Sequence, residues 1–131
     1  MKSKILSRSG ADSDQRTFVL IFDSGDEVIF GIEAFAEKQS LAASQFTGIG
    51  AFKQTLLGYF DWEKKEYQKI PIQEQVEVLS LVGDLTLKDG KPNIHAHVVV
   101  GRRDGTAHGG HLLKAYVRLT LEVILTETPK H

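Results

Sequence analysis

Four of the five histidines in this chain lie between Pro92 and Tyr116, at spacings that could hold a metal ion. His95 and His97 are two residues apart in an apolar run, and His108 and His111 follow the turn-forming pair Asp104-Gly105. Imidazole nitrogen is a preferred zinc ligand, at about 2.0–2.1 Å from the ion. The stretch predicts a β-hairpin with His95 and His97 on the first strand and His108 and His111 on the second.

Alternation along a strand places His95 and His97 on one face, because successive side chains point to opposite sides. Ile94, Ala96 and Val98 would then point to the other face, toward the core. Two imidazoles on one strand can converge on an ion, and a neighbouring strand must supply the third ligand. His111 is the natural candidate, since the turn folds its strand back on the first.

The length of the turn decides whether His111 joins the pair. A strict two-residue loop at Asp104-Gly105 would set His97 opposite Leu112 and turn His111 to the other side. A three-residue loop or a one-residue bulge restores it to the side of His95 and His97. We expect an irregularity between Gly101 and Gly110, with Gly109-Gly110 as the favoured place for a bulge.

Other polar residues leave alternatives open. A His-x-His pair alone is often a surface or hydrogen-bonded pair, and we expect His108 to be such a neighbour rather than a fourth ligand. Glu122 points outward, or it supports the histidines or acts as a general base beside them. Arg102 and Arg103 are exposed turn charges or an anion clamp. Glu122 and Arg102 are therefore the candidate catalytic residues, and Asp104 belongs to the turn.

Composition excludes several classes of protein. The chain has 131 residues, 41% hydrophobic, with a net charge of -1, so one soluble domain is expected and a protein specialised for gripping phosphate backbones is disfavoured. It has no cysteine, which rules out disulfides and thiolate ligands and fits a reducing cytoplasm. Neither a signal peptide nor a membrane span is expected.

The elements that must position the histidines follow from apolar patterns. Residues 17–22 form an apolar run typical of a buried strand, and apolar spacing over 26–40 predicts a helix with a Ser24/Glu27 capping box. Strands are expected after the helix, with aromatic cross-strand contacts among Tyr59, Phe60, Trp62 and Tyr67 and a bulge near Val78-Leu79. The expected strands are 44–52, 53–62, 66–70, 76–87, the histidine hairpin and 117–126. Asp89-Gly90 marks a hairpin turn.

This order predicts an α+β fold: a single compact domain whose highly curved, mainly antiparallel sheet carries one main helix near the N-terminus. Residues 1–15 are expected to be a flexible N-terminus, 16–127 the folded domain and 128–131 a tail.

Several segments in this order resemble the plants and prokaryotes conserved (PPC or PCC) domain family, in its stand-alone prokaryotic form. The resemblance runs from about Thr17 to Glu127. It rests on a leading strand and helix followed by Thr47-Gly48-Ile49-Gly50-Ala51, Leu57-Gly58-Tyr59-Phe60-Asp61, His95-Ala96-His97, Gly101-Arg102-Arg103-Asp104-Gly105 and Gly109-Gly110-His111-Leu112. The basic AT-hooks of plant members, and their Gly-Arg-Phe-Glu-Ile-Leu stretch, do not occur.

The resemblance implies a homotrimer and a zinc site of three histidines that map onto His95, His97 and His111. Three protein ligands leave a coordination position open for water or a small molecule, so metal-dependent chemistry is a hypothesis and a role as an enzyme stays open. The alternative is a DNA-associated or transcription-related interaction module with a structural metal. Direct nucleic-acid binding is disfavoured by the charge.

Overall fold

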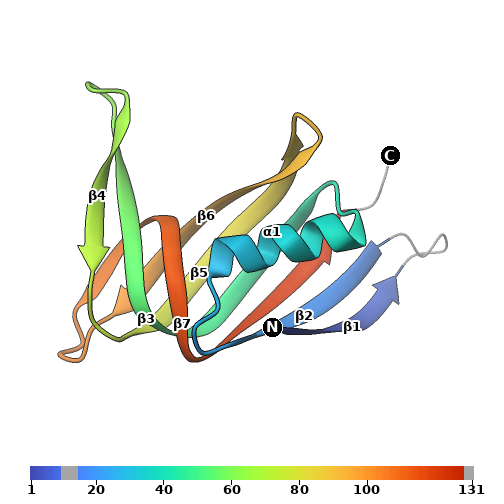
Figure 1. The fold of residues 1–131 in the computed structure, drawn as a ribbon, viewed down its shortest axis with the longest axis horizontal. Coiled ribbons are helices and arrows are strands. Elements are labelled where there is room, and N and C mark those ends of the chain that lie inside the picture. The colour runs from blue at the N-terminus through green and yellow to red at the C-terminus, as the bar shows by residue number, and fades with distance from the viewer. Residues whose placement is uncertain (10–14, 129–131) are drawn as a thin grey trace.

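The computed structural model describes residues 1–9 and 15–128, which form seven strands and one helix (Figure 1). In chain order the elements are β1 (Lys2–Ser9), β2 (Gln15–Asp23), α1 (Val28–Gln39), β3 (Ser44–Asp61), β4 (Glu66–Ile72), β5 (Val76–Lys88), β6 (Lys91–Gly101) and β7 (Ala107–Glu127). The helix found in the described residues lacks the length and apolar character needed to cross a membrane.

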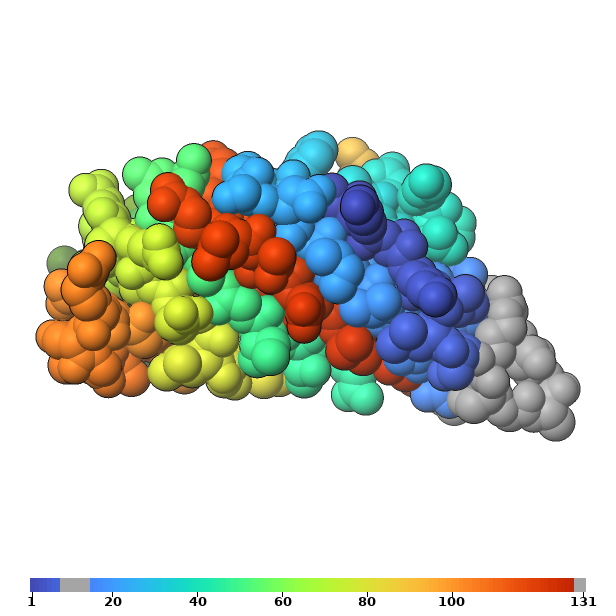
Figure 2. All heavy atoms as spheres, turned by 90° about the horizontal axis from the view of Figure 1, so that it is seen from below, coloured from blue at the N-terminus to red at the C-terminus, as the bar shows by residue number. Residues whose placement is uncertain are grey.

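All the strands belong to one sheet in the order β1-β2-β7-β6-β5-β3-β4, and every pairing is antiparallel. β7 also pairs with β3, so β3, β5, β6 and β7 pair in a closed cycle. Figure 2 shows the end of β7 (red) running between β2 (blue) and the start of β3 (green). The predicted antiparallel sheet with one helix near the N-terminus is confirmed.

The core lies between α1 and the inner face of the sheet, because alternate strand residues and one helix stripe are apolar. The helix buries Val28, Ile32, Phe35 and Ala36 against β6 and β7. From the strands come the largest of the fully buried side chains, Leu20, Phe22, Phe52, Leu57, Leu81, Leu85, Leu121 and Leu125. On β6, Ala96, Val98 and Val100 are buried, so the histidines two residues apart point to the opposite face.

The helix starts close to its predicted place, but a different residue caps it. Glu27 occupies the N-cap, and its carboxylate accepts hydrogen bonds from the backbone N–H groups of Ile29 and Phe30. The predicted Ser24/Glu27 capping box is therefore wrong. Ser24 Oγ instead accepts a hydrogen bond from the backbone N–H of Leu119, at 3.3 Å. At the other end the helix stops at Ser40, which is left-handed with a φ of 56°.

The N-terminal segment is more ordered than predicted. An irregular stretch was expected over 1–15, but Lys2–Ser9 forms β1 and pairs with β2, from Lys2 opposite Ile21 to Ser9 opposite Gln15. Residues 10–14, and 129–131 of the expected tail, lie outside the described residues.

Two long strands replace pairs of shorter predicted ones. β3 continues through the expected boundary between 52 and 53, and β7 joins the second histidine strand to the expected strand 117–126. Register shifts at Gly50/Phe52 and Phe52/Gln54 bend the β3–β7 pair without ending it. β4 likewise runs past the expected end at residue 70, through Pro71 to Ile72.

The hairpin that leads into the histidine strand is confirmed. Lys88 pairs with Lys91 across Asp89 and Gly90, whose φ angles of 54° and 77° are those of a type I′ turn. The bulge predicted near Val78-Leu79 is also confirmed, since the β5–β6 register shifts between Val78 and Ser80. With Leu79 as the extra residue, both Val78 and Leu81 remain in the core.

Candidate metal centre

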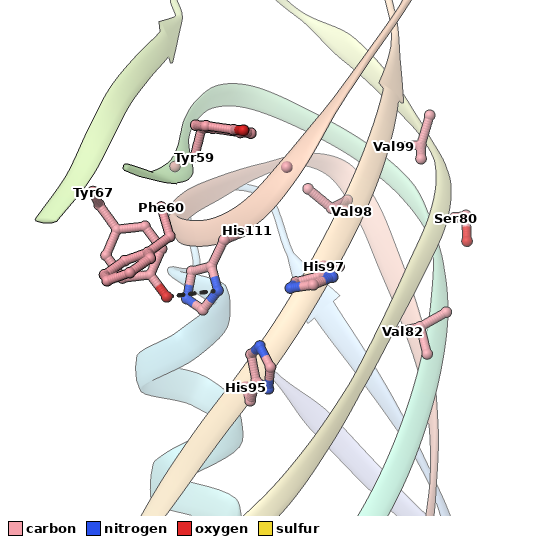
Figure 3. Close-up of a pocket in the computed structure, with 12 residues that line it drawn as sticks. Tyr59, Phe60, Tyr67, Ser80, Val82, His95, His97, Val98, Val99 and His111 are labelled. Carbon is pink, nitrogen blue, oxygen red and sulfur yellow. Dashed lines mark hydrogen bonds between the residues drawn. The ribbon is translucent and has the colours of Figure 1, made fainter. Parts of the chain in front are cut away.

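The three histidines expected to form a site lie together on the face of the sheet opposite the core (Figure 3). His95 and His97 project from β6, and His111 projects from β7 directly opposite His97 in the register. His95 and His97 are exposed, whereas His111 is half-buried. The alternation of strand residues and the pairing of two neighbouring strands are thus enough to bring the three imidazoles to one place.

A three-residue turn sets this register. The backbone N–H of Arg102 donates to the carbonyl of Thr106 at 2.9 Å, and that of Gly105 donates to the carbonyl of Arg102 at 2.8 Å. Gly105 takes a φ of 86°, the left-handed position that completes a three-residue hairpin loop. The expected irregularity between Gly101 and Gly110 is confirmed in this form. The bulge at Gly109-Gly110 is wrong, because these residues pair regularly with Val99 and Val98.

Asp104 belongs to this turn, as predicted. Its Oδ1 accepts hydrogen bonds from the backbone N–H of Thr106 at 3.0 Å and from Thr106 Oγ1 at 2.6 Å. These hydrogen bonds stabilise the charged carboxylate and lower the pKa of Asp104 below its ordinary value. The turn that fixes His111 opposite His97 is therefore itself held by a side chain.

The imidazoles are close enough to share one ion. One ligand nitrogen from each histidine lies within 4.8 Å of the others, and the ring centroids are 4.9 Å apart for His95–His97, 5.2 Å for His95–His111 and 5.7 Å for His97–His111. Nitrogens bound to one tetrahedral zinc would be about 3.3 Å apart. Rotation of the exposed His95 and His97 side chains can supply the remaining approach. Within residues 1–9 and 15–128 no other group of this kind is found.

The histidines lie in an open cleft with a volume of about 650 Å³. Its remaining walls are mostly apolar and aromatic, with Tyr59, Phe60 and Tyr67 on one side and Ser80, Val82 and Val99 on the other (Figure 3). The hydroxyl of Tyr67 lies 3.5 Å from His111 Nδ1, and the two rings are 4.8 Å apart. A volume of this size is typical of small-molecule sites.

The surroundings keep His111 neutral. Partial burial lowers the pKa of His111 below its ordinary value of 6.5, and the nearby His95 and His97 lower it further, because a second positive charge beside them would be repelled. A metal ligand must be the neutral imidazole, so this shift favours metal binding at neutral pH.

The other candidate residues do not join the three histidines. His108 is half-buried, opposite Val100, and an odd number of residues from His111, so its side chain points to the other face of β7. Glu122 is exposed and lines a separate hollow with Ile49 and Ile124. Arg102 forms an exposed ion pair with Glu74 beside the turn. None of the three is among the residues that line the histidine cleft.

The sequence did not predict that Phe60 and Tyr67 line the histidine cleft. The expected aromatic contacts of this hairpin are confirmed for Phe60, whose ring centroid lies 5.3 Å from that of Tyr67 and 6.5 Å from that of Trp62. Their position beside His111 depends on the β3–β7 pairing, in which Gly58 lies opposite His111. That pairing joins segments more than 50 residues apart, and no local pattern reveals it.

Comparison with known families identifies relatives along nearly the whole chain. The family model for the Plants and Prokaryotes Conserved (PCC) domain matches residues 9–129. Among curated proteins, none matches this chain at a significant level.

Three solved structures are similar to this one. A plant- and prokaryote-conserved (PPC) protein from Pyrococcus horikoshii is 33% identical, with a TM-score of 0.85, covering 99% of this chain and 84% of its own. A metal-containing protein from Archaeoglobus fulgidus is 40% identical, with a TM-score of 0.80 and coverages of 85% and 78%. A proposed DNA-binding protein from Ralstonia eutropha is 29% identical, with a TM-score of 0.82 and coverages of 86% and 78%.

Proposed function

Because this chain belongs to the Plants and Prokaryotes Conserved domain family, we propose that it is a metal-binding protein whose ion is held by His95, His97 and His111. The observation that carries the proposal is the approach of three imidazoles, from two paired strands, to within 4.8 Å at their ligand atoms. The metal-containing relative from Archaeoglobus fulgidus supports it independently.

We further propose zinc as the ion. The donor set fits zinc, which accepts imidazole nitrogen readily and is often held by three histidines with one position left open. His111 suits this role because its lowered pKa keeps the imidazole neutral, and Tyr67 Oη lies beside its Nδ1. A bound zinc ion would supply Lewis acidity and a site for water or for a small ligand. The open cleft of about 650 Å³ leaves room for such a ligand.

Metal analysis of the purified protein tests this proposal. After zinc supplementation and exhaustive dialysis, the wild type should carry one equivalent of zinc per chain. His97→Ala should lose it, because one of three ligands is removed. His108→Ala is the matched control: the same kind of substitution on the opposite face of β7 should keep one equivalent. A wild type without stoichiometric metal would contradict the proposal.

We also propose that the protein assembles as a homotrimer through the face of the sheet that α1 does not cover. Support comes from apolar side chains that are exposed on adjacent strands and do not line the histidine cleft: Ile49, Leu79 and Ile124. Clusters of this kind mark association surfaces, because a monomer gains nothing by leaving them in water. Sedimentation equilibrium should give three times the chain mass of 14.5 kDa.

An alternative is a DNA-associated interaction module in which the metal is structural. The description of the Ralstonia eutropha relative favours it, whereas the net charge of -1 weighs against direct binding to phosphates. DNA affinity measured between 50 and 200 mM salt separates the two functions. A steep fall with salt would support the alternative, and a flat or absent signal would contradict it.

A further inference from the structure

Two aromatic rings, those of Phe60 and Tyr67, line the cleft beside the three histidines. Phe60 and Tyr67 are cross-strand partners on β3 and β4, with ring centroids 5.3 Å apart at 72°. Both residues are exposed, at 42% and 41%. Figure 3 shows them on one side of the imidazoles. Exposed aromatic rings that line a concave site are typical of ligand contact rather than of core packing.

A glycine lets these rings reach the histidines. Gly58 on β3 lies between Lys69 of β4 and His111 of β7 in the register. A Cβ at this position would lie 3.0 Å from Tyr67 Cδ1 and 3.0 Å from Leu113 Cδ1, so no larger residue fits without moving both. The space above Gly58 is filled by the ring of Tyr67, which thereby lies 4.8 Å from the ring of His111.

Charge on this face favours an anion at the metal. Three neutral imidazoles add no negative charge, so a divalent ion bound by them would keep its full charge. Lys69 lies on the same face in the row that contains Gly58, His111 and His97. Asp84, opposite His95, is the acidic residue that pairs directly with a histidine. The sum of these charges remains positive, which suits a carboxylate more than an amine or a neutral group.

We propose that the cleft binds a small aromatic carboxylate, with its carboxylate at the metal ion and its ring against Phe60 and Tyr67. This inference rests on the metal centre proposed above. In this arrangement the ring of the ligand contacts Tyr67 and Phe60 beside the histidines. The apolar side chains of Val82 and Val99 line the opposite side of the cleft.

Calorimetric titration of the zinc-loaded protein with 2-naphthoate tests the inference, with metal content measured first in every sample. The wild type should bind 2-naphthoate about tenfold or more tightly than acetate, because the ring adds contacts that acetate lacks. The uncharged 2-naphthamide should bind more weakly than 2-naphthoate, because it lacks the charge that the metal ion attracts.

Variants locate the contact. Tyr67→Leu should weaken 2-naphthoate binding about 3- to 10-fold more than it weakens acetate binding, the range expected for one aromatic contact. Tyr67→Phe should restore the affinity, because the ring is retained. Trp62→Leu is the matched control: Trp62 is on the same hairpin and 71% exposed, but it does not line the cleft, so its loss should change nothing.

The outcomes separate the inference from the metal centre. If the wild type holds one zinc per chain but binds 2-naphthoate no more tightly than acetate, the proposal of an aromatic ligand is wrong and the metal centre stands. The same holds if the Tyr67→Leu variant binds 2-naphthoate as tightly as the wild type does. Equal affinity for 2-naphthamide overturns the anionic head group. A protein that holds no zinc overturns both proposals.

Discussion

At the scale of single residues, Glu27 connects the helix to the strand that carries His111. Its carboxylate accepts hydrogen bonds from the N–H groups of Ile29 at 3.2 Å and Phe30 at 2.8 Å, and from that of Ala115 on β7 at 3.0 Å. The first N–H groups of a helix have no partner within the helix, and a buried unpaired N–H is costly. One side chain therefore satisfies donors from two elements.

Replacing Glu27 should destabilise the protein. Glu27→Ala leaves three N–H groups without their acceptor and should lower the free energy of unfolding by about 1–2 kcal/mol. Urea denaturation followed by circular dichroism measures the change. The control is Glu37→Ala, an exposed position on the same helix, where the change should stay within about 0.5 kcal/mol. Equal losses in the two variants would show that the cap contributes nothing.

The lowered pKa of His111 predicts how the metal-free protein responds to acid. The unfolded chain binds a proton at this residue near pH 6.5, whereas the folded protein binds it only at lower pH. Between these two pKa values the unfolded state holds more protons. The free energy of unfolding should therefore be highest above pH 6.5 and fall as the pH drops below it.

The measurement is chemical denaturation in EDTA at pH 7.5 and at pH 5.5. His111→Gln cannot titrate, so its stability should fall less than that of the wild type over this interval. His108→Gln serves as a control and should behave as the wild type does. If the two variants lose stability equally, His111 does not contribute to the acid response.

At the scale of elements, the close approach of β3 and β7 at their register shift depends on Gly50. This residue has a φ of 155°, and a Cβ there would overlap the carbonyl oxygen of Thr120 and lie 2.7 Å from Cα of Leu121. Both obstacles are backbone atoms of the neighbouring strand, which cannot rotate away. The close contact is what allows a bent pair of long strands to remain hydrogen-bonded on both sides of the register shift.

Gly50→Ala should therefore cost about 2–4 kcal/mol of stability, a large value that reflects both strain and overlap. Gly105→Ala separates the two causes. Gly105 also has a positive φ, of 86°, but a Cβ there meets nothing within 4 Å, so only the backbone cost of about 1 kcal/mol is expected. Thermal or urea unfolding of both variants checks the difference. Similar losses would rule out a steric contribution at Gly50.

Sequence patterns predicted the elements that have local signals. The helix follows from apolar residues that recur with helical spacing, and the bulge at Leu79 follows from a change of alternation within one strand. β1 has no such signal, because its side chains up to Ser7 are exposed and its order comes from backbone pairing with β2. The joining of two predicted strands into β7 likewise depends on a distant segment, because β3 pairs with β7 from His111 to Glu127.

The histidine site was predictable for the same reason. Alternation along β6 and one hairpin turn fix the positions of His95, His97 and His111, and all of these lie within 17 consecutive residues. How His111 comes to face the same side as His95 and His97 was only partly predictable. A one-residue bulge and a three-residue loop both turn His111 to that side, and the pair Gly109-Gly110 favoured the bulge, which the structure does not have. Phe60 and Tyr67 reach the site through pairing between distant segments, for which a single sequence gives no pattern.

At the scale of the whole molecule, the exposed apolar face should control assembly. Ile49 is 60% exposed on this face, whereas Phe30, 71% exposed, lies on α1. Ile49→Lys places a charge in the proposed interface and should shift the mass from a trimer toward the 14.5 kDa monomer. Phe30→Lys should leave the trimer unchanged. Light scattering after size exclusion measures both, and dissociation by Phe30→Lys alone would move the interface to the helix.

The closed cycle of β3, β5, β6 and β7 has a consequence for aggregation. Within the cycle β6 pairs with β7 only over His97–Gly101, and of the described strands β1 and β4 lie at the two ends of the sheet order. Both carry features that discourage a further strand from adding. β1 has Lys2 and Lys4 and a register shift between Ile5 and Ser7, and β4 has Pro71, which lacks an N–H to donate. Growth into fibrils by pairing at these two terminal strands is thereby disfavoured, even though most of the chain is β-strand.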